Sequence, residues 1–281
     1  MGLVQKTASV IFLLVLFGGF MATARAADGP GGHSADCCQH ENAQIARWQQ
    51  NADRLYARFK PREAAAELQK VLEIDADNFA ALIKLARAYI DIGDHIAENG
   101  SDSKERKMKE YARAEDYARK AVKVDPSSTW GHFWVAASLG NIAMVSPVEK
   151  QLDLAGEIRD AVEESIARDP QNGLAYHIYG VWHRKLAELG QGKRLLAGVF
   201  YGRSPPSGSL QKSIEYLKKA VALNPTVILC RLELARSYVA VQEFADARAM
   251  LQSVPALPIQ FSDDAKHKQE SAQLLQQIKD S

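Results

Sequence analysis

The sequence has little cysteine, no excess of charge of either sign and none of the short motifs that mark common catalytic sites. Its 281 residues include three cysteines, and its 35 basic residues nearly balance its 34 acidic residues. An odd and small number of cysteines excludes a complete disulfide framework of the kind that stabilises small secreted domains. Balanced charge argues against a nucleic-acid-binding protein or a binder of anionic membranes, because both need clustered lysine and arginine.

Catalytic motifs are also missing. The sequence contains no phosphate-binding G-x-x-x-x-G-K-[ST], no metalloprotease H-E-x-x-H and no hydrolase G-x-S-x-G. Gly190 and Gly192 precede Lys193, but they follow an expected helix rather than a strand, so we interpret them as a turn. The histidines of the central region have no partnered serine, cysteine or spaced carboxylate. The sequence therefore predicts a protein that is not an enzyme and has no catalytic residues, cofactor or metal.

The N-terminal segment differs in composition from the rest of the chain. Lys6 is followed by 18 uncharged residues, 7–24, and Ala24, Arg25 and Ala26 form an A-x-A pattern. A basic start, an apolar run and small residues at its end are typical of a secretory signal peptide, here residues 1–26. We therefore expect an exported, periplasmic or secreted protein. The alternative is a membrane anchor formed by residues 7–24, since such a run can just span a bilayer.

Residues 27–43 (ADGPGGHSADCCQHENA) are rich in glycine and polar residues and lack helical periodicity. We expect a flexible leader there. His33, Cys37, Cys38 and His40 carry the donor atoms that zinc and copper prefer. Because the two cysteines are adjacent and no scaffold holds them, a vicinal disulfide or an unstructured tail is the alternative that we favour.

A helical repeat organises the remaining chain and is clearest between Val227 and Pro258. Counted from residue 228, Leu234, Ala235 and Tyr238 occupy positions 7, 8 and 11 of this repeat. A tetratricopeptide repeat of 34 residues fills those positions with the large, small and aromatic packing residues of its first helix. The preceding Pro225 lies where a proline can end one helix before the next begins.

About five such units fill residues 44–281 as a single domain. They begin at Ile45, Phe79, Thr129, Gly173 and Ile228. The polar stretch SDDAKHKQESAQLLQQIKD comes after them, with Ser262 as the expected N-cap, and is typical of a helix that closes a solenoid. The sequence therefore predicts an all-α fold, a tetratricopeptide-repeat-like right-handed α-solenoid of about five helix pairs with insertions and a C-terminal capping helix.

Three units are longer than the repeat. The additional residues follow the first helix of the unit and lie around 94–107, 141–147 and 186–208. The first of these stretches is polar and charged, so we expect it to leave the stack as a loop or as a solvated helix extension.

Several segments resemble one particular family of repeat proteins. They are His132 with Trp134, the segment GVWHRKLAEL with Gly180 and Trp182, the insertion FYGRSPPSGSLQKSIEYLKKA, and the closing ALNP and LELARSYVA. Together they resemble the regulator of microtubule dynamics family over most of residues 45–255. The resemblance implies a non-enzymatic helical-repeat protein. It also implies an N-terminal hydrophobic segment and a link to microtubules or organelle contact sites, as in the animal members. Combined with the predicted signal peptide, the resemblance indicates an exported bacterial relative.

The first helices of such a superhelix line its concave face through positions 2, 5, 9 and 12. Residues at these positions predict a groove that binds a partner protein or peptide: Arg87, Trp130, Phe133, His177, Arg184 and Arg236. Arginine beside aromatic side chains suits an extended peptide with acidic groups, because guanidinium binds carboxylate through two hydrogen bonds. The alternative is that these arginines form ordinary surface salt bridges and that the aromatic residues pack beneath an insertion. Trp134 and Trp182 are expected in the core.

Two functions remain open on sequence grounds. One is a non-enzymatic interaction scaffold that uses the concave groove. The other is a structural or assembly component that acts through self-association or membrane tethering. In the second case the groove is filled by another copy or by the insertion residues Leu195, Phe200 and Tyr201. The sequence leaves the oligomeric state and the identity of the partner open.

Overall fold

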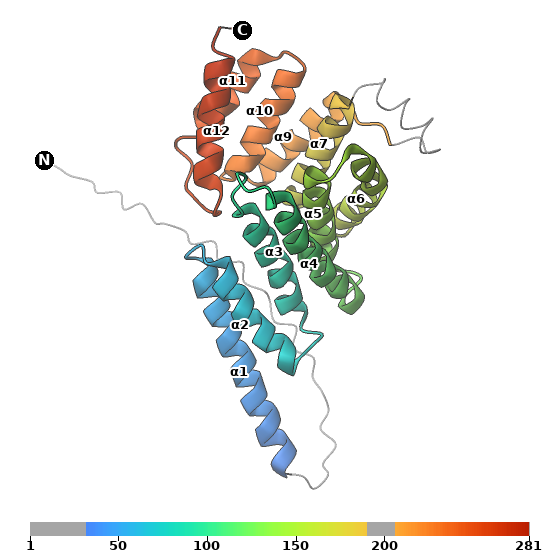
Figure 1. The fold of residues 1–281 in the computed structure, drawn as a ribbon, viewed down its shortest axis with the longest axis vertical. Helices are drawn as coiled ribbons and strands as arrows, with labels where there is room; N and C mark the ends of the chain where they lie inside the picture. The colour runs from blue at the N-terminus through green and yellow to red at the C-terminus, as the bar shows by residue number, and fades with distance from the viewer. Residues whose placement is uncertain (1–31, 190–205, 281) are drawn as a thin grey trace, which may run out of the picture. The chain divides into compact units, whose positions relative to one another are not determined.

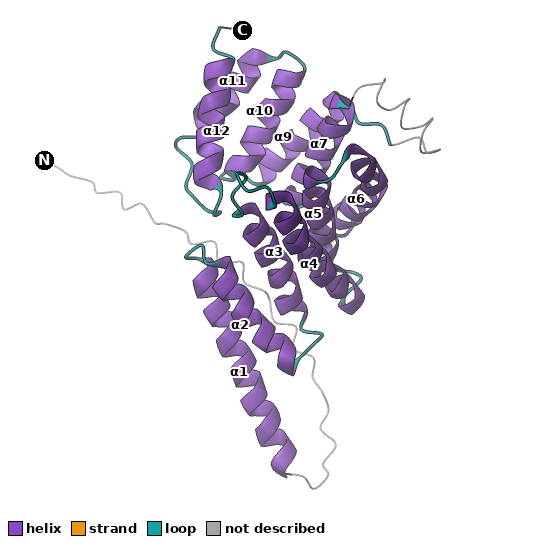
Figure 2. Cartoon of the chain, in the orientation of Figure 1, coloured by secondary structure: helices purple, strands orange, loops and turns teal. Residues whose placement is uncertain are grey.

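The computed structural model describes the backbone of residues 32–189 and 206–280, with side chains from residue 39 onward. The chain divides into two compact units, residues 1–39 and residues 40–281. The second unit contains almost all of the described residues. Within the described residues every regular element is an α-helix (Figures 1 and 2).

The helices follow one another as five pairs and a terminal helix. The pairs are α1 (Gly32–Tyr56) with α2 (Pro61–Ile74), α3 (Phe79–Asp94) with α4 (Ser103–Val124), α5 (Thr129–Val145) with α6 (Val148–Arg168), α7 (Gly173–Glu188) with α9 (Leu210–Leu223), and α10 (Ile228–Ala240) with α11 (Phe244–Ser253). The terminal helix α12 (Asp264–Gln277) packs on α10 and α11. Second helices also contact the first helix of the following pair, as α4 contacts α5 and α9 contacts α10. The predicted all-α repeat architecture is confirmed.

Local sequence signals set the helix boundaries. The Asn78 side chain accepts a hydrogen bond from Ala81 N at 3.0 Å, and Asn172 accepts one from Ala175 N at 3.2 Å. These bonds satisfy backbone N–H groups that the first turn of a helix leaves without a partner. Pro61 opens α2 at a position where its missing N–H costs nothing. The starts of α2, α3 and α7 therefore follow from residues next to them in the sequence.

The turns that join the helices of the first and last pairs share one geometry. Phe59 and Gln242 are the non-glycine residues with positive φ, 57° and 65°, among those described. Each sits in a turn in which a later N–H returns to the end of the first helix: Lys60 N donates to Leu55 O at 3.0 Å. A left-handed residue at this position is the usual way to end a helix. It allows the second helix to fold back after only three or four residues.

Small residues bring paired helices close together. Gly180 in α7 faces Leu217 in α9, and a Cβ added to Gly180 would lie 2.5 Å from Leu217 Cγ. Ala86 in α3 and Ala118 in α4 have no exposed surface. The large residues beside them fill the space between pairs, as Leu82 does with no exposed surface. The core is therefore packed by the large and small residues that the repeat pattern predicted.

The additional residues of the first two longer units partly extend helices and partly form connections. Helix α4 begins at Ser103 and so takes up the end of the first polar stretch, leaving residues 95–102 as the connection. Helix α5 runs on to Val145, and only Ser146 and Pro147 separate it from α6. In the third insertion, residues 190–205 lie outside the described residues, and so do Leu195, Phe200 and Tyr201.

The two ends of the repeat region differ from expectation. Helix α1 begins at Gly32, so residues 32–43, which we expected to be part of a flexible leader, belong to a helix. No sharp helix breaker follows Gly32, and a helix can carry the exposed polar residues 39–42 on its surface. At the other end, the N-cap of α12 is Asp263 rather than Ser262, and it makes no side-chain capping bond.

The N-terminal predictions fall mostly on residues that are not described. The predicted signal peptide 1–26 and residues 27–31 lie outside the described part of the chain, as do the side chains of His33, Cys37 and Cys38. Among the helices that are described, none combines the length and the apolar character needed to cross a bilayer. No group of three metal-binding side chains occurs among the described residues.

Candidate functional site

The residues predicted to line one groove lie in three different environments. Trp130 and Phe133 belong to α5, His177 and Arg184 to α7, Arg236 to α10, and Arg87 to α3. Trp130 and Phe133 contact each other within α5. Arg184 and Arg236 come from different helices and are joined through a carboxylate, that of Glu233, which the sequence prediction did not include.

Phe133 is a core residue, which corrects its assignment to the surface of the groove. It is 5% exposed and packs edge-on against Trp130 and Trp134, with ring centroids 5.5 and 4.7 Å apart. Edge-to-face pairs of this kind stabilise an aromatic cluster. Trp182, as predicted, is also buried, and its Nε1 donates a hydrogen bond to Ala155 O at 2.8 Å. Of the predicted aromatic pair, Trp130 alone retains partial exposure.

Arg184 and Arg236 belong to a ladder of alternating charges that crosses three helices. Arg184 of α7 pairs with Glu233 of α10, Glu233 pairs with Arg236, and Arg236 Nη2 lies 2.9 Å from Glu270 Oε2 of α12. Burial alone would raise the pKa of the Glu233 carboxyl, but Arg184 and Arg236 hold it below the ordinary value. The ladder thus neutralises two of the three predicted arginines within the protein.

Sequence reasoning missed Glu233 because it follows the positions expected to face the groove. One local signal could have found part of the ladder. Glu233 stands three residues before Arg236, a spacing that places both side chains on the same face of a helix. Its pairing with Arg184, 49 residues earlier, has no counterpart in local spacing.

Two histidines of α7 are held neutral by burial. Burial lowers the pKa of His177 to about 4, opposed by the Glu233 carboxylate. Burial also lowers the pKa of His183 to about 4. His183 is 4% exposed and stacks on Tyr216, with ring centroids 5.5 Å apart. At neutral pH both histidines act as uncharged packing groups.

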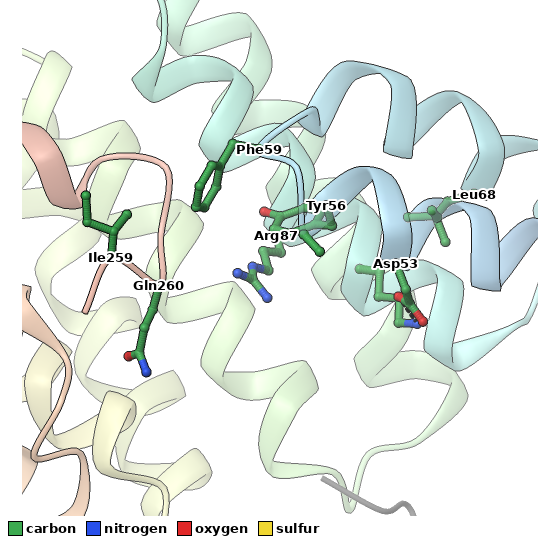
Figure 3. A pocket seen from close by; sticks show the side chains of 10 residues that line it. Asp53, Tyr56, Phe59, Leu68, Arg87, Ile259 and Gln260 are labelled. Carbon is green, nitrogen blue, oxygen red and sulfur yellow. Dashed lines mark hydrogen bonds and ion pairs between the residues drawn. The ribbon is translucent and has the colours of Figure 1, made fainter. Parts of the chain in front are cut away.

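Arg87 has different surroundings from the other arginines. It borders a cavity of about 430 Å³ beside α1, α2 and α3 (Figure 3). The lining residues come from α1, the turn between α1 and α2, α2, α3 and the connection between α11 and α12: Ala52, Asp53, Tyr56, Ala57, Phe59, Leu68, Lys84, Arg87, Ile259 and Gln260. The Arg87 guanidinium carbon lies 4.1 Å from the centre of the Tyr56 ring and 5.5 Å from that of Phe261.

The Arg87 guanidinium makes no hydrogen bond or ion pair with any residue that the structure describes. The nearby Asp53 carboxylate is bound to Lys84, with Asp53 Oδ1 and Lys84 Nζ 2.6 Å apart. Burial lowers the pKa of Arg87 to about 10, and Asp53 partly opposes this effect. Arg87 therefore remains charged at neutral pH while its hydrogen-bond donors lack an acceptor among the described residues.

The connection between α11 and α12, residues 254–263, closes one side of this cavity. Its Phe261 lies beside Arg87 of α3, and His95 Nε2 is 3.8 Å from Asp263 Oδ1. The Asp264 Oδ2 atom accepts hydrogen bonds from the backbone N–H groups of Gln260 and Phe261, at 2.7 and 2.9 Å. These two bonds hold the connection against the start of α12, whereas the Phe261 and Asp263 contacts link it to α3 and His95.

The architecture is that of a tetratricopeptide-repeat-like α-solenoid. It superposes on the crystal structure of a thermophilic tetratricopeptide-repeat protein from Thermus thermophilus with a TM-score of 0.60 and 16% sequence identity. The superposition covers 83% of this chain and 99% of that protein. At this identity the likeness establishes the fold.

The sequence comparison identifies a family, which is a more specific assignment than the fold. The sequence profile of the family described as Regulator of microtubule dynamics protein 1-3 matches residues 48–279, and the chain belongs to this family. Regulator of microtubule dynamics protein 1 of Mus musculus is 25% identical over 242 residues, which are 84% of this chain and 75% of the mouse protein. The Homo sapiens protein of the same name is 26% identical over 193 residues, which are 68% of this chain and 60% of the human protein. The resemblance inferred from the sequence is confirmed.

Proposed function

We propose that this protein is a non-enzymatic interaction scaffold that holds a partner protein or peptide on the face formed by the first helices of its repeats. The observation that supports this most directly is the Arg87 cavity. It combines a charged group that has no acceptor in the described part of the chain, apolar walls and an open volume. Concave sites with a few fixed polar groups are the usual binding sites of proteins. The charge ladder, by contrast, leaves little unpaired charge beside Arg184 and Arg236.

The proposal concentrates binding on one end of the repeat array. In the sequence prediction three arginines shared the recognition of an acidic partner. With Arg184 and Arg236 paired internally, we assign that role to Arg87 and a structural role to the other two. His177, which is held neutral beside Glu233, belongs with the structural group. Trp130, partly exposed on α5, is an additional contact for a longer partner.

We also propose that the protein acts after export, in the periplasm or outside the cell. The basis is the sequence pattern of residues 1–26. Relatives take their name from microtubule dynamics, but an exported protein would not encounter cytosolic microtubules, so a different partner is proposed here. Sequencing the N-terminus of the mature protein tests this point. A start at Ala27 is expected, and a start at Met1 in a cytosolic fraction would contradict export.

The scaffold proposal is tested by cross-linking in the native compartment followed by capture. The wild-type chain is compared with Arg87→Met and with Arg113→Met as a matched control. Arg113 also lies near a tyrosine ring, 5.5 Å from the centre of Tyr89, but it is paired with Glu110. The proposal is supported if a partner is captured by the wild type and by Arg113→Met but not by folded Arg87→Met. The purified partner should then bind the wild type again.

Three other outcomes would contradict it. Equal capture by all three proteins would place binding away from the Arg87 cavity. Capture of the same chain alone would favour the alternative function, an assembly component that acts through self-association. Recovery only with membranes would favour membrane tethering.

A further inference from the structure

We propose that the Arg87 cavity binds the C-terminal residue of a partner peptide, with the α-carboxylate on Arg87 and an apolar side chain between Phe59 and Ile259. The inference rests on the proposed function and adds the chemical class of the partner. It assigns to the cavity one anionic anchor, one apolar contact and polar groups that recognise a peptide bond.

The anchor follows from the geometry of Arg87. One face of its guanidinium lies over the Tyr56 ring at 4.1 Å, which leaves the edge of the group with its N–H donors unused. A carboxylate binds that edge through two parallel hydrogen bonds, and arginine is better suited to this than lysine. Burial of Arg87 already disfavours its charge, as its lowered pKa shows. A carboxylate in the cavity would restore the missing partner of a partly desolvated cation.

The charges around the cavity favour a ligand with a single negative charge. Lys84 is the other cation in the lining, and it is bound to Asp53 at 2.6 Å. Asp53 also places a negative charge on the same wall. A phosphate group with two charges would meet one unpaired arginine and one repelling carboxylate. A carboxylate needs only Arg87.

The apolar walls define what stands next to the carboxylate. Phe59 and Ile259 are 45% and 51% exposed and are among the large hydrophobic residues that the core leaves at the surface. Figure 3 shows them at the rim of the cavity, with Phe59 near Arg87 and Ile259 on the facing connection. The volume of about 430 Å³ lies at the low end of ligand pockets, which hold roughly 300–1,000 Å³. One apolar residue and its neighbour fit such a space, whereas a folded domain does not.

The polar groups favour a peptide over a simple carboxylic acid. The second oxygen of Asp53 is not used by Lys84, and the Asp53 side chain is 58% exposed, so it can accept a peptide N–H. Gln260 is exposed and uses its Oε1 to accept a bond from Thr226, at 3.3 Å, so its amide N–H groups can donate to a peptide carbonyl. A fatty acid offers neither of these groups. A peptide end satisfies both and Arg87 at the same time.

The test uses a pair of fluorescent pentapeptides with the same sequence and a C-terminal leucine, one with a free carboxylate and one with a carboxamide. Fluorescence anisotropy with the purified full-length chain measures their dissociation constants. The free acid should bind about 10-fold or more tightly than the amide, the size expected for a hydrogen bond to a charged partner. Arg87→Met should remove that preference, and Arg113→Met should keep it.

A second variant keeps the proposal testable if Arg87→Met fails to fold. Ile259→Ser changes an exposed side chain and should leave the thermal midpoint unchanged. It should lower the affinity for the free-acid peptide that ends in leucine several-fold. The affinity for a free-acid peptide that ends in glycine should not change. Equal affinity of acid and amide for the wild type would overturn the inference, and so would the same loss for both acids in Ile259→Ser.

A third probe separates the two sources of a carboxylate. Octanoate carries an apolar chain and a carboxylate but no peptide bond. Displacement of the peptide by octanoate at equal concentration would assign the cavity to small carboxylic acids and overturn the peptide-end inference. If no peptide binds but cross-linked partner is still lost in Arg87→Met, the inference fails while the proposed scaffold function stands. If partner capture is also unchanged in that variant, both fail.

Discussion

The side chains of Arg184 in α7 and Glu233 in α10 form an ion pair in which they are only 5% and 8% exposed. Arg236 and Glu270 continue the ladder to α12, so the last two repeats and the terminal helix are joined by charges rather than by apolar contacts alone. A buried charge that loses its partner is costly, because water cannot replace the lost interaction. The stability of the C-terminal half therefore depends on Glu233.

Replacing Glu233 with glutamine should destabilise the protein strongly, because it removes the buried counter-charge of Arg184 and leaves only the more exposed Glu188. We expect a loss of about 3–5 kcal/mol in the free energy of unfolding, measured by chemical denaturation. Glu188→Gln is the control, since Glu188 also pairs with Arg184 but is 40% exposed, and it should cost less than about 1 kcal/mol. Similar losses in the two variants would show that burial of the pair is not what matters.

Two glycines in first helices should respond to alanine in opposite directions. At Gly180 an added Cβ lies 2.5 Å from Leu217 Cγ and 3.1 Å from the Ser213 carbonyl oxygen, so Gly180→Ala must push α7 and α9 apart. The expected loss of stability is about 1–3 kcal/mol. At Gly140 nothing lies within 4 Å of the added atom, so Gly140→Ala should gain up to about 1 kcal/mol from helix propensity. Thermal unfolding of both variants measures the contrast, and a stabilised Gly180→Ala would contradict the close packing.

The stability of the protein should fall in acid partly through His183. Its pKa in the folded protein, about 4, lies below the ordinary value of 6.5, so the unfolded chain binds the proton first. The stabilising contribution is therefore complete above about pH 6.5 and is lost as the pH falls toward 4. His183→Phe keeps an aromatic ring in the stack with Tyr179 and Tyr216 and cannot be protonated.

The variant should lose less stability than the wild type between pH 7 and pH 4, by on the order of 1–2 kcal/mol. Denaturant titrations at a series of pH values give the comparison. At neutral pH the two proteins should be within about 1 kcal/mol, because His183 is uncharged there and has no hydrogen-bond partner among the described residues. Parallel pH profiles would show that His183 does not titrate as its burial implies.

Tyr56 allows stacking and hydrogen bonding to be separated beside the cavity. Its ring lies under Arg87, and its buried hydroxyl has no hydrogen-bond partner among the described residues. Tyr56→Phe keeps the ring and removes an unsatisfied polar atom, so stability should be unchanged or increased by up to about 1 kcal/mol. Tyr56→Ala removes the ring and should lower both stability and the affinity for the free-acid peptide. A large loss of stability in Tyr56→Phe would mean that the hydroxyl is satisfied in solution.

The sequence by itself determined the helices, their pairing and the packing within each pair. These features depend on residues that are neighbours in the chain: Pro61 at the start of α2, Asn172 before α7, and the large and small residues that recur along each repeat. The spacing of a helix converts such local patterns directly into a buried face. For the same reason, the course of α1 through residues 32–43 was missed, since the glycine-rich and polar sequence of this segment has no apolar periodicity to reveal a helix.

Tertiary structure alone decided which groove residues are available. Arg87 and Arg236 occupy the same position of their repeats, position 9 counted from Phe79 and from Ile228. Arg236 is paired with Glu233 and Glu270, whereas Arg87 lies in a cavity closed by a connection that begins more than 160 residues later in the chain. Periodicity fixes the face on which a side chain lies, but the charge opposite it comes from distant segments. Those segments meet only when the solenoid has folded.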